Sequence, residues 1–123
     1  MKKLLIIIFI FFCNNCFAID KSTTFTNEFF QKSQSEGKIV VINSWNKFCI
    51  TCSKQIKILN QAKKEFKEVI FLSFEQTKNK DIAQFLKIDY WTTIVIYKDN
   101  KETYRSMGVT NKSEIYSAIK SNT

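Results

Sequence analysis

The sequence predicts an α/β domain with a central mixed sheet of four to five strands flanked by helices on both faces. Three observations favour this fold class. Apolar runs without alternation, such as Ile39-Val40-Val41-Ile42, are typical of strands buried on both faces. Between these runs lie segments with the three- and four-residue apolar spacing of helices. Near the end of the chain, Asp99-Asn100 is a turn signal that separates two closing strands, which adds an antiparallel hairpin.

The first four elements are two helices and two strands in alternation. Residues 25–33 place three phenylalanines on one helical face. The strand at 38–44 is followed by a helix at 49–68, and residues 69–74 form the second apolar strand. Because a long helix joins them, these two strands should form a right-handed parallel crossover. The apolar residues expected to face inward from the long helix are Ile56, Leu59, Ala62 and Phe66.

The second half of the chain adds a short helix, the hairpin and a last helix, so the full order is α-β-α-β-α-β-β-α. The short helix covers residues 80–86, and the hairpin pairs residues 93–97 with residues 102–107. Asn111 or Ser113 should cap the last helix, because a short polar side chain there can accept a hydrogen bond from the first helical turn.

The first 18 residues have the three parts of a secretory signal. Residues 1–3 are a positive start, residues 4–12 are an apolar run of nine, and Ala18 offers a small residue for cleavage. Nine apolar residues are too few to span a bilayer, which needs about 20. We therefore expect a signal peptide at 1–18, a single domain at 19–123 and a periplasmic or otherwise exported location. An uncleaved signal would instead anchor the protein to a membrane.

Composition excludes several functional classes. The 123 residues contain no histidine, so hydrolases that depend on a Ser-His-Asp or Cys-His arrangement are excluded. The net charge of +8 becomes +6 once Lys2 and Lys3 leave with the signal. A basic balance favours acidic partners. The lysines are scattered between hydrophobic positions, however, which argues against nucleic acid as a partner.

Cys49 and Cys52 are the strongest functional signal in the chain. The other two of the four cysteines, Cys13 and Cys16, lie in the predicted signal. A disulfide between residues so close in sequence removes little chain entropy, so we expect the pair to do chemistry rather than hold the fold. Two alternatives stay open. In the first, the pair is a static disulfide. In the second, the chain keeps its signal and the pair is half of a zinc site shared with Cys13 and Cys16.

The pair falls where a buried strand meets a helix, the place expected of a thioredoxin-like redox site. The motif Cys49-Ile50-Thr51-Cys52-Ser53-Lys54 follows Trp45, and the stretch from Thr92 to Asn100 ends a strand in a turn before Gly108. On these residues the chain resembles the thioredoxin superfamily across nearly all of residues 24–120. The export signal favours the secreted branch, which comprises periplasmic thiol–disulfide oxidoreductases and the thioredoxins of cytochrome c maturation.

The position of Cys49 should favour its thiolate. The thiolate is the attacking species in disulfide exchange, and free cysteine has a pKa of about 8.5. At the start of the long helix Cys49 would face unpaired N–H groups and the positive end of the dipole, with Lys47 and Lys54 adding positive potential. Cys52 should be more buried and keep its proton. The resemblance implies the same roles: Cys49 attacks, Cys52 resolves the mixed disulfide, and no cofactor or metal takes part.

The resemblance also implies substrate contacts beside the pair. Trp45 and Phe48 should pack near the site and present an apolar platform to an extended substrate. The loop with Trp91 and Thr92 should hold the substrate backbone opposite the cysteines. The superfamily has a cis-proline where this chain has Thr92. Because a cis bond before a residue other than proline costs about 2.5–4 kcal/mol, we expect a trans Trp91–Thr92 bond, with the Thr92 hydroxyl available to Cys49. Loss of the proline also leaves open metal or iron–sulfur capture by the thiols.

Asn43 is a second departure from the superfamily pattern. In thioredoxin itself a buried aspartate at this place helps to move the proton of the resolving thiol, and its lysine partner falls on Phe71 here. Asparagine cannot titrate, so proton transfer at Cys52 would rely on water or on Glu75. The alternative for Glu75 is a solvated residue at the end of a strand.

These observations predict an exported thiol–disulfide oxidoreductase that exchanges disulfides with cysteine-containing exported proteins. We expect a monomer that exchanges electrons with a membrane-embedded donor or acceptor. The sequence does not distinguish an oxidant from a reductant or an isomerase. The competing hypothesis is a non-catalytic binding or assembly module for exported proteins, built on the same fold.

Overall fold

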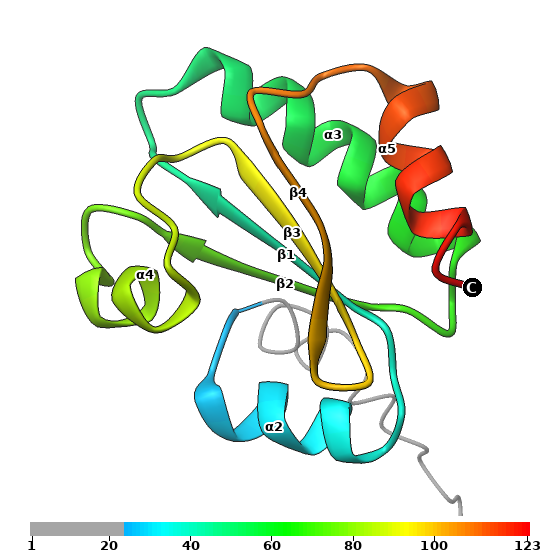
Figure 1. Cartoon of the computed structure of the whole chain (residues 1–123). Helices are drawn as coiled ribbons and strands as arrows, with labels where there is room; N and C mark the ends of the chain where they lie inside the picture. The colour runs from blue at the N-terminus through cyan, green and yellow to red at the C-terminus, as the bar shows by residue number, and fades with distance from the viewer. Residues whose placement is uncertain (1–23) are drawn as a thin grey trace, which may run out of the picture.

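The computed structural model describes residues 24–123, so the predicted signal at 1–18, with Cys13 and Cys16, lies outside the described residues. The eight elements follow the predicted order (Figure 1). In chain order they are α2 (Asn27–Ser35), β1 (Val40–Trp45), α3 (Ile50–Glu65), β2 (Ile70–Glu75), α4 (Lys80–Leu86), β3 (Thr93–Lys98), β4 (Lys101–Met107) and α5 (Lys112–Lys120).

The four strands form one mixed sheet in the order β2-β1-β3-β4. Strands β1 and β2 are parallel, as the crossover predicts, whereas β3 is antiparallel to both β1 and β4. At the outer edge of β2 a single bridge joins Thr24 and Ser73, and the N–H of Phe25 donates to the carbonyl of Ser73 at 2.8 Å. The predicted mixed sheet is thus confirmed, with four strands in the part of the chain that the structure describes.

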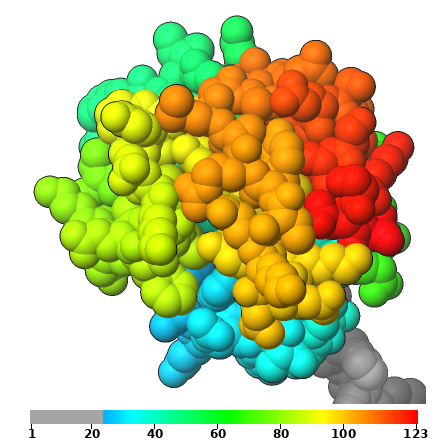
Figure 2. Space-filling view, viewed as in Figure 1, coloured from blue at the N-terminus to red at the C-terminus, as the bar shows by residue number. Residues whose placement is uncertain are grey.

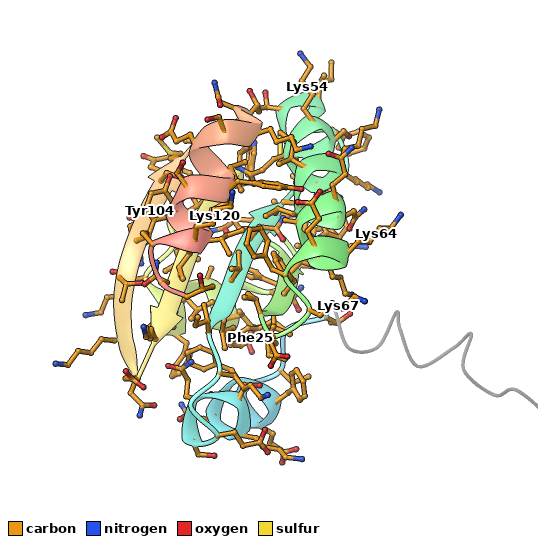
Figure 3. All side chains as sticks on the ribbon, turned by 90° about the vertical axis from the view of Figure 1, so that its right-hand side faces the viewer. Phe25, Lys54, Lys64, Lys67, Tyr104 and Lys120 are labelled. Atoms are coloured by element: carbon orange, nitrogen blue, oxygen red, sulfur yellow. A yellow bond between two sulfur atoms is a disulfide. The ribbon has the colours of Figure 1, made fainter. Side chains whose placement is uncertain are left out.

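Helices cover both faces of this sheet. Helices α3 and α5 lie together on one face, and α2 and α4 lie on the other (Figures 1 and 3). Neighbouring residues of β1 therefore enter opposite cores: Val41 packs with residues of α3 and α5, and Ile42 packs with residues of α2 and α4. Burial on both faces explains why the β1 sequence is a continuous apolar run.

Two helix ends differ from the sequence-based expectation. Phe25 precedes α2, because Thr26 caps that helix by accepting a hydrogen bond from the N–H of Phe29 at 3.2 Å. Helix α3 ends at Glu65 rather than at residue 68. Phe66 leaves the helical conformation, and its ring packs edge-on against Tyr116 with the centroids 5.4 Å apart. Phe66 is thus the residue at which α3 ends, and it joins the core between α3 and α5.

The topology brings three segments together at one edge of the sheet. Because β1 and β3 are antiparallel, the end of β1 lies beside the start of β3, and α3 begins just after β1 (Figure 1). Cysteines at the start of α3 therefore face the residues that lead into β3. Within residues 24–123, no helix combines the length and the apolar character needed to cross a membrane.

Candidate functional site

Cys49 is the residue that caps α3. The turn before it is shaped by Asn46, whose Oδ1 accepts a hydrogen bond from the N–H of Phe48 and whose carbonyl accepts one from the N–H of Cys49, both at 3.1 Å. Cys49 has extended backbone, and its Sγ accepts a hydrogen bond from the N–H of Cys52 at 3.0 Å. The sulfur thus takes the place of a capping oxygen at the positive end of the helix dipole. Lys54 points outward from the same end of α3 (Figure 3).

Cys49 and Cys52 are joined in a disulfide. The side chain of Cys52 is only 2% exposed, whereas Cys49 is half-buried. A partner thiol therefore approaches the Cys49 sulfur and not the Cys52 sulfur. The predicted arrangement is confirmed: both sulfurs lie at a helix start, with the outer one accessible and the inner one enclosed.

Thr92 faces both sulfurs from the start of β3. Its Oγ1 lies 3.0 Å from Cys52 Sγ and 3.3 Å from Cys49 Sγ. The Trp91–Thr92 bond is trans, as expected. Thr92 has instead a φ of +62°, in the left-handed region. For a β-branched residue this conformation is strained, at a cost of about 1–3 kcal/mol.

Three hydrogen bonds hold Thr92 in this strained conformation. Its N–H donates to the carbonyl of Ser44 at 2.8 Å. Its carbonyl accepts from the N–H of Gly108 at 2.8 Å and from Nε2 of Gln55 at 3.2 Å. The partners belong to β1, to α3 and to the segment that follows β4, so three separate parts of the fold fix the position of one side chain.

Gln55 is a site residue that the sequence-based prediction missed. It is completely buried although polar, and its Nε2 also donates to the carbonyl of Val109 at 2.9 Å. Gln55 follows Cys52 by three positions on the inward face of α3, whereas Ile56, which we expected to face inward, is only half-buried. The sequence did contain a signal for Gln55: it is a polar residue three positions after Cys52, on a helical face whose other inward residues are apolar.

We expect Gln55→Leu to lower the free energy of unfolding by about 1–3 kcal/mol, because it removes two donors from buried or partly buried carbonyls. Urea unfolding measures the change. The matched control is Gln61→Leu on the exposed face of the same helix, which should alter stability by less than about 0.5 kcal/mol. Equal losses in the two variants would contradict the role assigned to Gln55.

Large apolar side chains are exposed around the disulfide. Phe48 is 83% exposed, Ile50 is 78% exposed, and Trp91 and the last residue of β4, Met107, are also exposed. The Nζ of Lys47 lies over the ring of Phe48, 5.1 Å from the ring centroid. Figure 2 shows the beginning of α3 projecting from the top of the molecule. The structure thus places Phe48 and Trp91 at the surface beside the sulfurs. Ile50 and Met107 are also exposed there, and the sequence-based prediction did not include them.

Trp45 lies apart from this exposed surface. It is half-buried and lines a groove of about 640 Å³ between α3 and strands β1 and β2, together with Asn43 and Ile56. Asn43 is buried, and its Nδ2 has no hydrogen-bond partner. Packing of Trp45 against the cysteines stays a prediction. A contact of Trp45 with substrate stays a prediction.

Glu75, which we expected to transfer protons or to be solvated, is buried with its side chain 8% exposed. The solvated alternative is therefore wrong: Glu75 pairs with Trp45 in the sheet, and its Oε2 forms an ion pair with Nζ of exposed Lys78 at 3.3 Å. Among the described residues the hydrogen-bond partner of Cys52 Sγ is Thr92. A proton-transfer role for Glu75 stays a prediction.

Metal binding by the two cysteines would need ligands from elsewhere. Residues 24–123 contain no group of three or more cysteine, aspartate or glutamate side chains placed to hold a metal ion. The zinc alternative depends on Cys13 and Cys16, which lie outside the described residues. The described part of the site therefore consists of two sulfurs, one hydroxyl and the backbone groups that orient them.

A half-buried disulfide that caps the helix after a parallel strand defines a thiol–disulfide exchange site. Residues 20–121 match the thioredoxin family, and the chain belongs to that family. Over 93 residues it is 30% identical to a thioredoxin H-type of Fagopyrum esculentum, covering 76% of this chain and 79% of that protein. It is also 30% identical over 93 residues to thioredoxin H-type 1 of Nicotiana tabacum, covering 76% of this chain and 73% of that protein.

Solved structures of thioredoxins have the same fold. Mitochondrial thioredoxin 3 of Saccharomyces cerevisiae, in its oxidized form, superposes with a TM-score of 0.72 at 20% identity, covering 83% of this chain and 96% of that one. The thioredoxin of Fasciola hepatica gives a TM-score of 0.69 at 24% identity, covering 76% and 91%. Family membership and the Cys49–Cys52 pair together make the chain a thiol–disulfide oxidoreductase.

Proposed function

We propose that this oxidoreductase works outside the cytoplasm, in a periplasm or an equivalent exported compartment, on cysteine-containing exported proteins. The proposal rests on residues 1–18, which have the positive start, apolar run and small residue of a secretory signal. Their removal after Ala18 leaves Cys49 and Cys52 as the only cysteines. The observation that carries the chemistry is the half-exposed Cys49 sulfur at the start of α3, bonded to an enclosed Cys52 sulfur.

The geometry supports a stepwise exchange. A substrate thiolate attacks Cys49 Sγ, the bond between Cys49 and Cys52 breaks, and the electron pair goes to Cys52 Sγ. A second substrate thiol, as its thiolate, then attacks the mixed disulfide, which leaves an oxidised substrate and a dithiol protein. Reduction of a substrate follows the same steps in reverse. The direction depends on the reduction potential of the pair against that of its partners.

Phe48, Ile50, Trp91 and Met107 supply the surface for the substrate. Exposed apolar side chains on several sides of a reactive sulfur favour a partner segment that is itself apolar and extended, because the contact removes apolar area from water. An exported reductant of this kind needs electrons from a membrane-embedded donor, and an oxidant needs a membrane-embedded acceptor. We propose that the protein binds its substrates and its membrane-embedded partner as a monomer.

Trapping of substrates tests the proposal. In the full-length chain, Cys52→Ser removes the resolving sulfur, so we expect mixed disulfides at Cys49 to accumulate in the exported fraction. Mass spectrometry after non-reducing electrophoresis identifies the partners and the N-terminus of the trapped chain, which should begin at Ile19. The matched control is Cys49→Ser, which should trap nothing. Adducts confined to the cytoplasmic fraction would overturn the exported role, and a lack of adducts would overturn the substrate class.

The exposed apolar surface also favours a second candidate, a non-catalytic binding or assembly module for exported proteins. Such a module would grip apolar segments through Phe48, Ile50 and Trp91 without turnover. It would keep its biological function in Cys49→Ser and lose it in a Phe48→Ser/Ile50→Ser double variant. If the protein is an oxidoreductase, Cys49→Ser should instead lose the biological function.

A further inference from the structure

The enclosed sulfur of Cys52 carries a negative charge in every exchange. When a partner thiolate opens the disulfide, the leaving electron pair resides on Cys52 Sγ. Cys52 is only 2% exposed, so bulk water has little access to this charge. A buried thiolate without a hydrogen-bond donor is strongly disfavoured. Asn43 cannot titrate, and its Nδ2 forms no hydrogen bond to this sulfur.

The hydroxyl of Thr92 is the group in the right place. Its Oγ1 lies 3.0 Å from Cys52 Sγ, and no other described residue forms a hydrogen bond with that sulfur. Cys49 Sγ, in contrast, already accepts the N–H of Cys52 at the helix start. Thr92 Oγ1 also lies 3.3 Å from Cys49 Sγ, but that sulfur has the backbone N–H at the start of α3 as a second donor, whereas the inner sulfur has the Thr92 hydroxyl alone among the described residues.

The backbone strain at Thr92 supports this reading. Glycine adopts a φ of +62° without steric cost, but glycine would leave no hydroxyl between the strand and the sulfurs. Ser44, Gly108 and Gln55 hold the strained residue from three sides. The same hydrogen bonds that maintain the strain also fix where the Thr92 hydroxyl lies. Strain that the surroundings enforce beside reacting atoms is typical of functional sites.

We propose that Thr92 is a catalytic residue whose hydroxyl donates a hydrogen bond to the Cys52 thiolate. The inference deepens the exchange chemistry of Cys49 and Cys52 and rests on it. As the sulfur–sulfur bond breaks and a new bond forms between Cys49 and the partner, the electron pair moves to Cys52 Sγ while the Thr92 proton stays on its oxygen. By microscopic reversibility, the same hydrogen bond stabilises the Cys52 thiolate when it attacks a mixed disulfide.

Opening of the disulfide by dithiothreitol tests the proposal. Thr92→Val keeps the β-branched shape and removes the hydroxyl, and we expect it to slow opening by about tenfold, because a hydrogen bond to a charged group is lost. Thr92→Ser keeps the hydroxyl and should stay within about threefold of the wild-type rate. Thr103→Val on β4, far along the chain from the cysteines, removes a hydroxyl that donates to the carbonyl of Ile96 and should leave the rate unchanged.

A second measurement separates a chemical role from a structural one. With both cysteines present, Thr92→Val should accumulate the mixed disulfide at Cys49 during reaction with a substrate protein such as insulin, because the attack by Cys52 is slowed. In a Cys52→Ala background, alkylation of Cys49 by iodoacetamide should change by less than about threefold between threonine and valine at position 92, because the backbone N–H at position 52, at 3.0 Å, is a nearer donor to that sulfur than Thr92 Oγ1, at 3.3 Å. A merely damaged loop would slow both reactions.

Each outcome decides the question. Wild-type rates of opening and of resolution in folded Thr92→Val would overturn the proposal while leaving the oxidoreductase function intact. If Thr92→Val does not fold, Thr92→Ala provides the same comparison without the branched side chain, again with Thr92→Ser as the reference. Failure of the wild-type protein itself to exchange with dithiothreitol would instead overturn the exchange chemistry on which the proposal rests.

Discussion

Cys49→Ser is expected to abolish disulfide exchange. In an assay of insulin reduction by dithiothreitol, the variant should be no faster than dithiothreitol alone, because a serine hydroxyl is not ionised at neutral pH and cannot replace the thiolate. The enclosed position of Cys52, 2% exposed, keeps that sulfur from taking over the reaction. The rate of insulin precipitation measures the effect directly.

The control for this result is Thr51→Ser, a change of similar size between the two cysteines. Thr51 is exposed, and its substitution leaves both sulfurs, the cap of α3 and the hydroxyl of Thr92 in place. Thr51→Ser should keep at least about a third of the wild-type rate, as expected of a surface substitution. Residual turnover by Cys49→Ser, or its absence in both variants, would contradict the assignment of Cys49 as the attacking sulfur.

Ile42→Ala is expected to have a large effect on stability. Ile42 lies in β1, is completely buried, and packs in the core that α2 and α4 cover. Removing most of its side chain loses the favourable burial and leaves a cavity, which together cost about 2–5 kcal/mol. Because domains of this size are stable by only about 5–15 kcal/mol, the midpoint of urea unfolding should move to a clearly lower concentration.

The same substitution at Ile50 provides the contrast. Ile50 is 78% exposed at the start of α3, so Ile50→Ala removes little buried area and should change stability by less than about 0.5 kcal/mol. If Ile50 contacts substrates as proposed, its loss should weaken exchange with protein substrates more than exchange with dithiothreitol. Similar unfolding midpoints for the Ile42 and Ile50 variants would show that the described core is wrong.

Local patterns in the sequence predicted the architecture. The unbroken apolar run before Ser44 marked β1 as a strand buried on both faces, and Asn111 caps α5 as expected by accepting a hydrogen bond from the N–H of Glu114 at 3.1 Å. The place of Cys49 followed from the change of apolar spacing after β1. These features depend on residues near one another in the chain, which is why sequence patterns report them.

Features that depend on distant parts of the chain escaped prediction. The strained φ of Thr92 arises from contacts with Ser44, Gln55 and Gly108, which no local pattern reveals. Likewise the sequence around Glu75 reads as the polar end of a strand, but in the folded chain its side chain is only 8% exposed. The motif thus identified the two sulfurs, whereas the position of the Thr92 hydroxyl that faces them could be seen only in the folded chain.

Ser44 fixes the short segment that leads into β3. Its carbonyl accepts the N–H of Thr92, while its Oγ donates to the carbonyl of Tyr90 at 2.9 Å and accepts the N–H of Thr93 at 3.3 Å. Residues 76–89, which include α4, make none of these three hydrogen bonds. We therefore expect changes to exposed residues of that segment to alter the outer surface of the protein more than its disulfide chemistry.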